Sequence, residues 1–318
     1  MVNTCAAAAD AALACLGVAS DDDVLVVCNE AQRSMAGALE TSARARARNV
    51  TCLSYPPLTR HGEEPPPFVT DAMKEASVIF APTTYSLSHT QARAAATARG
   101  VRIATMSGVT EEIFKRSLCV DYAELERAGR RVADALSAAS TCRVTTPAGT
   151  DVVLDLEGRT AISDDGNLSA RSAWGNLPAG EGYIAPHEEV GDGTIVFDGA
   201  LAGYGLLREP LRVTLQGGRA TSADGEAAAW LLATLDAGGP TGRLIAELGI
   251  GTNPAAILTG EICEDEKVIG TAHLAFGMSV SVGGTNVAAV HIDGMMLKPT
   301  VELDGRLLIE DGQLRHEG

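Results

Sequence analysis

The stretch SVIFAPTTYSLSHTQARAAATARGVRIATM (77–106) decides the fold of the first part of the chain. It opens and closes on short apolar runs, 77–82 and 101–106, that are typical of buried strands. Between them, SHTQARAAATARG (88–100) has the composition of a helix that ends at a glycine. Two strands joined by one helix predict a parallel crossover, because parallel neighbours need a long connection.

The same alternation extends upstream through two more strand-like runs, VLVVC (24–28) and VTCLSY (50–55), with helical segments between them. Four strands separated by single helices indicate a small parallel sheet of the Rossmann-like or flavodoxin-like class. No GxGxxG follows the first strand, where Cys28, Asn29 and Glu30 stand, so we expect no dinucleotide site.

The hydrophobic periodicity and glycine content of the sequence change after a predicted helix near 122–139. RVTTPAGTDVVLDLEG (143–158) alternates with period two around a Pro-Ala-Gly turn, and glycine-rich hairpins follow it. We therefore predict two domains: an α/β domain over 1–140, and an α+β, mainly antiparallel, metal-binding domain over 141–318.

Composition excludes several classes of partner. The chain has 318 residues with 25 basic and 41 acidic side chains, a net charge of −16, and only 4% aromatic residues. Neither a nucleic acid nor an anionic membrane surface suits so acidic a chain. The seven cysteines form no CxxC pair, no basic region precedes the apolar N-terminal run, and no apolar run of about 18 residues occurs. We therefore expect a cytoplasmic protein with reduced thiols.

Five residues of the second half could carry chemistry. In VAAVHIDGMM (287–296), His291 and Asp293 would share one face of a strand and could converge on one metal ion. His273 lies in an apolar, strand-like run, and Glu247 lies in RLIAELGIGTNP (243–254), where a charge must be paired or coordinated. Glu181, in a turn framed by proline and glycine, is on its own typical of an exposed carboxylate.

Together, two histidines and three carboxylates fit a nitrogen and oxygen metal site. The absence of cysteine among these five candidate ligands argues against structural zinc and favours catalytic Zn, Mn, Co or Fe(II). His273, His291 and Asp293 alone could form a facial triad of two histidines and one carboxylate, as in Fe(II) oxygenases. All five could instead hold one or two divalent ions in a hydrolase.

Several ordered motifs of the second half resemble those of a known family. They are NLPAGEGYIAP (176–186), AELGIGTNP (246–254), LTGEICEDEKVIGTAHLAFG (258–277), HIDGMM (291–296) and PTVELDG (299–305). This part of the chain resembles the aminopeptidase T family of metal-dependent aminopeptidases. It is most similar to the short leucyl aminopeptidase-like branch, which also includes 2,5-dihydroxypyridine 5,6-dioxygenase.

The resemblance implies a metal-ligand set of Glu181, Glu247, His273, His291 and Asp293. Where the peptidases carry a tyrosine ligand, this chain has Val280, which weakens the case for a dinuclear centre. The resemblance also implies a homo-oligomer. Lys267 could orient a carboxylate or bind a substrate anion, or it could be a solvated lysine among acidic neighbours.

Two enzymatic hypotheses remain open at this point. The first is an aminopeptidase-type hydrolase of a peptide or small amide that uses Zn, Co or Mn, with Glu181 or Glu247 as general base. The second is a mononuclear Fe(II) dioxygenase that cleaves the ring of a hydroxylated N-heteroaromatic small molecule, which the loss of the tyrosine at Val280 favours. A metal-free binding module on an old enzyme fold is the third reading.

Overall fold

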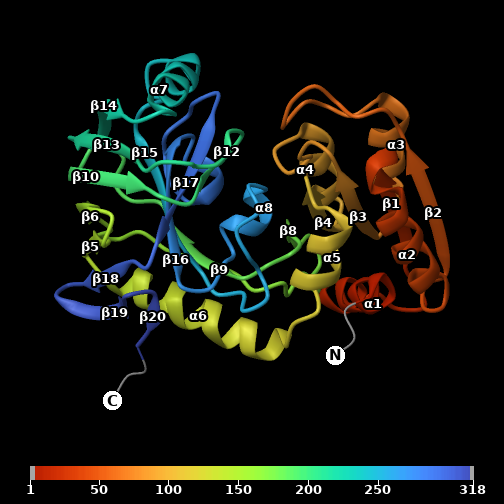
Figure 1. Cartoon of the computed structure of the whole chain (residues 1–318). Helices are drawn as coiled ribbons and strands as arrows, with labels where there is room; N and C mark the ends of the chain where they lie inside the picture. The colour runs from red at the N-terminus through yellow and green to blue at the C-terminus, as the bar shows by residue number, and fades with distance from the viewer. Residues whose placement is uncertain (1–3, 316–318) are drawn as a thin grey trace. The chain divides into compact units, whose positions relative to one another are not determined.

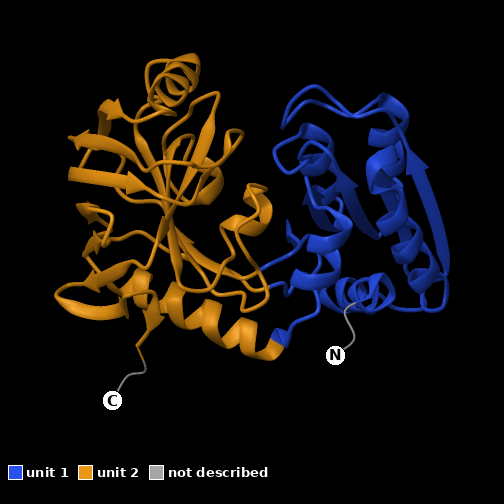
Figure 2. Cartoon of the chain, in the orientation of Figure 1, with its two compact units in different colours: residues 1–122, 166–179 blue, residues 123–165, 180–318 orange. Residues whose placement is uncertain are grey.

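The structure is a computed structural model that describes residues 4–315, and it divides into two compact units. Unit 1 comprises residues up to Tyr122 together with 166–179, and unit 2 comprises 123–165 and the chain from Gly180 onward (Figure 2). These limits differ from a single boundary at residue 140, because the helix before it belongs mostly to unit 2 and a later segment returns to unit 1. The two-domain division at residue 140 stays a prediction.

Unit 1 is a parallel sheet with helices on both faces, as the sequence predicts, but it has a fifth strand beyond the four predicted ones (Figure 1). Its order is β2-β1-β3-β4-β8, the flavodoxin-like arrangement, with β8 as the fifth strand. The strands are β1 (Asp23–Cys28), β2 (Asn49–Ser54), β3 (Val78–Thr83), β4 (Arg102–Ser107) and β8 (Trp174–Asn176). The helices are α1 (Cys5–Cys15), the 3-10 turn η1 (Glu30–Gln32), α2 (Arg33–Arg44), α3 (Pro67–Glu75), α4 (Gln91–Ala98) and α5 (Glu111–Ser117).

The apolar strand runs follow from this two-sided covering. Leu25 and Val27 pack toward one helical layer, where Val69 of α3 and Ala92 of α4 belong to the same buried cluster. The whole of β3 is buried, so no polar alternation is needed along it. Thr90 caps the N-terminus of helix α4, because its side chain accepts from the backbone N–H of Arg93.

Unit 2 contains two antiparallel sheets that share one apolar core. An eight-stranded sheet has the order β14-β13-β10-β6-β5-β18-β19-β20, and a seven-stranded sheet has the order β12-β11-β17-β16-β15-β9-β7. The core takes side chains from both sheets, and Phe197 and Phe276 meet edge to face within it at 6.4 Å between ring centroids. Helices α6 and α7 add Val132, Leu136 and Leu231.

The elements of unit 2 are short strands with few helices (Figure 1). The eight-stranded sheet consists of β5 (Thr141–Thr145), β6 (Asp151–Asp155), β10 (Asp192–Phe197), β13 (Leu211–Gln216), β14 (Arg219–Asp224), β18 (Thr300–Leu303), β19 (Arg306–Glu310) and β20 (Gln313–Leu314). The seven-stranded sheet consists of β7 (Ile162–Asp164), β9 (Glu181–Ile184), β11 (Ala200–Leu201), β12 (Gly205–Leu206), β15 (Ile245–Gly251), β16 (Thr271–Gly277) and β17 (His291–Leu297). The helices are α6 (Tyr122–Ala138), α7 (Ala228–Ala237), α8 (Ile262–Asp265) and the 3-10 turn η2 (Val280–Val282).

Two compositional expectations can be compared with this fold. None of the seven cysteines, all of which lie within the described residues, forms a disulfide, and Cys15, Cys28, Cys142 and Cys263 are buried. Among residues 4–315, no helix is long and apolar enough to cross a membrane.

Candidate metal centre

The five candidate ligands come from four neighbouring strands of the seven-stranded sheet. Glu181 is on β9, Glu247 on β15, His273 on β16, and His291 and Asp293 on β17. The register pairs Glu181 with Gly251, Glu247 with Ala275, and Ala275 with Asp293. Paired residues of antiparallel strands share a face, so all five lie on one face of the sheet. The other face belongs to the apolar core.

A β-bulge in β15 turns Glu247 toward this face. Ile245 pairs with Phe276 and Glu247 pairs with Ala275, with a register shift between them. Without the shift, residues two apart would share a face, and Glu247 would lie with Ile245 in the core. The bulge therefore allows one apolar strand to supply both a core side chain and a carboxylate of the site.

The side chains of the five residues lie close together. His273 Nε2 is 3.3 Å from Glu181 Oε2 and 3.5 Å from Glu247 Oε1. His291 Nε2 is 3.2 Å from Glu247 Oε2 and 3.3 Å from Asp293 Oδ1. The Glu247 carboxylate thus spans the two imidazoles. The structure brings together all five predicted residues, whereas their role as ligands stays a prediction.

Several buried atoms of the cluster fit a metal ion better than they fit one another. Glu181 Oε2 and both ring nitrogens of His273 make no hydrogen bond within the described chain, although all three atoms are buried. Two ligands at right angles around an ion with bonds of about 2.1 Å lie about 3.0 Å apart, close to the spacings of the cluster. Unpaired polar atoms at this spacing are the arrangement that a shared cation would satisfy.

A backbone carbonyl orients the His291 ring toward the cluster. Its Nδ1 lies 2.7 Å from the carbonyl oxygen of Met278, at the start of the loop between β16 and β17. A proton on Nδ1 would donate to this carbonyl, and Nε2 would then present its lone pair to the cluster. Ligating histidines in proteins are typically oriented in this way.

The electrostatics of the cluster favour added positive charge. Burial opposes ionisation of Glu247, but His273 and His291 lower the pKa of this carboxyl to about 2. Burial alone would lower the pKa of the two histidines, but the facing carboxylates outweigh it. The pKa of His273 rises to about 9, and that of His291 rises well above its usual value. Protons or a divalent cation can supply that charge.

Lys267 is a fully buried neighbour of the cluster. Its Nζ lies 2.5 Å from Glu181 Oε1, 2.6 Å from Glu266 Oε1 and 3.4 Å from Asp164 Oδ2. Burial alone would lower the pKa of Lys267, but these carboxylates raise it well above the usual value. Of the three interpretations of Lys267 left open by the sequence, the orientation of a carboxylate is the one that the contacts support.

Sequence reasoning missed part of this surrounding. Glu266 lies in the acidic run 264–266, which is typical of a solvated surface in sequence, although Glu264 and Asp265 are buried. No sequence pattern marks Asp164, yet both Glu266 and Asp164 face Lys267. Val280, in the place of the peptidase tyrosine, lies on η2 with 47% exposure, and its side chain has no atom that could bind a metal.

The loop before His291 is held by a buried ion pair. Glu188 accepts from Ser279 Oγ at 2.5 Å and from the backbone N–H of Thr285 at 2.6 Å, and it pairs with Arg159 at 2.6 Å. The segment GGTN (283–286) therefore directs the backbone N–H groups of Thr285 and Asn286 to an internal carboxylate. This carboxylate supports the loop that carries the Met278 carbonyl.

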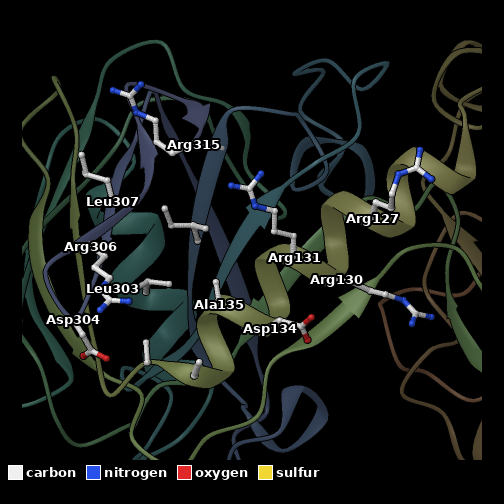
Figure 3. A pocket seen from close by; sticks show the side chains of 13 residues that line it. Arg127, Arg130, Arg131, Asp134, Ala135, Leu303, Asp304, Arg306, Leu307 and Arg315 are labelled. Atoms are coloured by element: carbon white, nitrogen blue, oxygen red, sulfur yellow. The ribbon is translucent and has the colours of Figure 1, made fainter. Parts of the chain in front are cut away.

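A separate pocket of unit 2 contains none of the candidate ligands. It lies along α6, β18 and β19, and Figure 3 shows five arginines around it. They are Arg127, Arg130, Arg131, Arg306 and Arg315. Guanidinium groups repel a cation, so this pocket is not a metal site.

Comparison with known proteins identifies the family. Residues 2–316 match the family model described as NicX, 2,5-dihydroxypyridine 5,6-dioxygenase. The chain belongs to the 2,5-dihydroxypyridine 5,6-dioxygenase family. No curated protein matches this member of the family in sequence.

Two solved structures are similar to this dioxygenase-family chain in fold. The 2,5-dihydroxypyridine dioxygenase from Pseudomonas putida KT2440 has 19% identity and a TM-score of 0.82, with 98% of this chain and 97% of that chain covered. Wild-type AmpT from Thermus thermophilus has 18% identity and a TM-score of 0.74, with 98% and 99% covered. The predicted fold class and the resemblance to the aminopeptidase T-like branch are thus confirmed, and the chain is of an enzyme family.

A prediction follows from the space beside His273. Gly249 pairs with His273 across β15 and β16, and a Cβ at Gly249 would lie 2.1 Å from His273 Nε2. Gly249→Ala should therefore displace the imidazole and weaken metal binding about ten- to hundredfold, the effect typical of disturbing a ligand's support. Isothermal titration with Zn(II) measures this.

Gly37→Ala is the matched control, because a Cβ at Gly37 meets no atom within 4 Å. It should bind metal as the wild type does. Unchanged affinity in Gly249→Ala would show that His273 is not a ligand.

Proposed function

We propose that this protein is a mononuclear non-haem Fe(II) dioxygenase that cleaves the ring of a hydroxylated N-heteroaromatic, with 2,5-dihydroxypyridine as the first substrate to test. The observation that carries the proposal is the family match over residues 2–316. The placement of His273, His291 and Asp293 on one face of the sheet supports it, because two histidines and one carboxylate are the usual ligands of such iron.

His273, His291 and Asp293 would hold the iron, with Glu247 between the two imidazoles. Iron(II) bound there supplies the redox chemistry that activates dioxygen, and it neutralises part of the negative charge of the site. In ring cleavage by a dioxygenase both oxygen atoms enter the product and one ring bond breaks, so no external reductant is consumed.

The residues around the ligands have distinct tasks in this proposal. The Met278 carbonyl orients His291 through Nδ1. Glu247 lies within reach of both imidazoles, and its low pKa keeps it ionised, so it can balance the charge of the ion. Glu181 has its Oε2 free of hydrogen bonds, which suits it to accept a proton from a substrate hydroxyl.

The hydrolase, the first hypothesis from the sequence, has weaker support than the dioxygenase. The similarity to AmpT is at 18% sequence identity, so it supports a shared fold and not a shared reaction. The family match bears the dioxygenase description. In addition, Val280 replaces the tyrosine of the peptidases, and it is exposed.

Oxygen consumption tests the proposal. Protein reconstituted anaerobically with Fe(II) should consume one O2 for each 2,5-dihydroxypyridine cleaved, as measured with an oxygen electrode and by loss of the substrate's ultraviolet absorbance. A parallel series with Zn, Co or Mn and aminoacyl amides should show no turnover. No oxygen uptake at confirmed iron occupancy would contradict the proposal, and amide turnover would instead support the hydrolase.

A further inference from the structure

The ammonium group of Lys267 is surrounded by carboxylates. The side chain is fully buried, and Nζ contacts one oxygen each of Glu181 and Glu266 and lies 3.4 Å from Asp164. A buried ammonium needs such partners, because its desolvation is otherwise too costly. The three carboxylates converge on one cation that is part of the chain itself.

Two of these carboxylates also belong to groups that could bind a metal. Glu181 groups with Glu247 and His273, and Glu266 groups with His273 and Asp293, in each case with ligand atoms within 4.8 Å of one another. Lys267 donates to Oε1 of Glu181, while Oε2 of the same carboxylate makes no hydrogen bond and lies 3.3 Å from His273 Nε2. The ammonium and the candidate metal therefore share the bridging carboxylate Glu181.

The backbone holds Lys267 firmly in this place. Its carbonyl accepts from the backbone N–H of Asn253 at 2.8 Å, and its own N–H donates to the carbonyl of Glu264 at 2.9 Å. The segment also packs so closely on β15 that a Cβ at Gly251 would lie 2.1 Å from the carbonyl oxygen of Val268. Nζ is therefore fixed among the carboxylates.

We infer that Lys267 takes the place of a second cation beside the metal, so that this chain binds one divalent ion where its ligand set could otherwise hold two. The inference rests on the metal centre of the proposed function. A second divalent ion among Glu181, Glu266 and Asp164 would meet the ammonium at contact distance, and like charges repel strongly in a buried site. The ion that remains would be held by His273, His291 and Asp293, with Glu247 between the two imidazoles.

Metal stoichiometry tests the inference without any substrate. Wild type and Lys267→Met are dialysed to equilibrium with saturating Co(II) or Zn(II), and the ions per chain are measured by elemental analysis. Wild type should bind one ion. Lys267→Met, which keeps the length of the side chain but leaves three carboxylates without their cation, should bind two.

Lys74→Met is the matched control, because Lys74 pairs with Asp71 on the surface of α3 and lies far from the cluster in sequence. It should keep one ion. A single ion in folded Lys267→Met would overturn the inference. Two ions in the wild type would also overturn it, and this measurement does not depend on whether the variant folds.

The outcome is separable from that of the proposed reaction. One ion in the wild type and two in Lys267→Met, with no oxygen uptake, would sustain the role of Lys267 and contradict the dioxygenase. A wild type that binds no ion would overturn both.

Discussion

Asp293→Ala is expected to abolish retention of Fe(II) and with it the consumption of oxygen. Asp293 supplies the carboxylate of the proposed triad, and its Oδ1 lies 3.3 Å from His291 Nε2. Loss of groups that merely support a ligand costs about 10–100-fold in metal affinity, so loss of a ligand should cost more than about 100-fold. Elemental analysis after desalting and oxygen-electrode assays measure the two effects.

Asp224→Ala makes the same change at an exposed position of unit 2 and should leave both quantities unchanged. Circular dichroism should show both variants folded, because Asp293 lies at the site face of β17 and not in the apolar core. Full metal stoichiometry in folded Asp293→Ala would show that the ligands are wrongly assigned. His291→Ala should behave as Asp293→Ala does.

Glu188→Ala should have the largest effect on stability. Only 7% of the Glu188 side chain and 12% of the Arg159 side chain are exposed, so the variant leaves a largely buried guanidinium without its carboxylate. Removing one partner of a buried ion pair costs about 3–5 kcal/mol of unfolding free energy. Urea denaturation measures this loss, and metal affinity should fall as well because the loop before His291 loses its anchor.

The stabilisation by Glu188 should also depend on pH. Burial alone would raise the pKa of Glu188. Hydrogen bonds from Ser279 and the Thr285 N–H and the charge of Arg159 outweigh burial and lower this pKa from the usual 4.5 to about 2. A carboxyl with a depressed folded-state pKa stabilises the fold above its unfolded pKa and loses that effect as pH falls. The difference between wild type and Glu188→Ala should therefore be full above about pH 4.5 and shrink toward pH 2.

Glu189→Ala, at the exposed neighbouring position, is the control and should unfold within about 0.5 kcal/mol of the wild type. If Glu188→Ala matched it, the ion pair with Arg159 would not be what holds the loop.

Much of the architecture could be predicted from local patterns. The four runs at 24–28, 50–55, 77–82 and 101–106 each become a parallel strand within a residue of the expected limits. The runs 24–28, 77–82 and 101–106 are recognisable because strands covered on both faces are continuously apolar, whereas 50–55 becomes the partly exposed edge strand β2. The strand Trp174–Asn176 escaped notice, since three residues without an apolar run carry no such signal.

The candidate site could be predicted in its members but not in its organisation. Glu247 can be recognised from the sequence, because it is the one acid in an apolar run and a buried charge requires a partner. The bulge that turns this acid from the core, and the burial of Lys267 within an acidic run, depend on pairing between distant segments. Such tertiary effects leave no local trace in the sequence.

The position of β8 late in the sequence has a consequence for folding during synthesis. This strand pairs with β4 but is encoded some 70 residues after it, beyond a first portion of unit 2. A nascent chain that has emerged only as far as residue 140 thus carries four parallel strands whose β4 edge is still open. Open edges recruit foreign strands, so the protein is exposed to misassembly on the ribosome until residue 176 has followed. For the same reason, a fragment ending at residue 140 is a poor choice for expression, and the sheet is better obtained from the full chain.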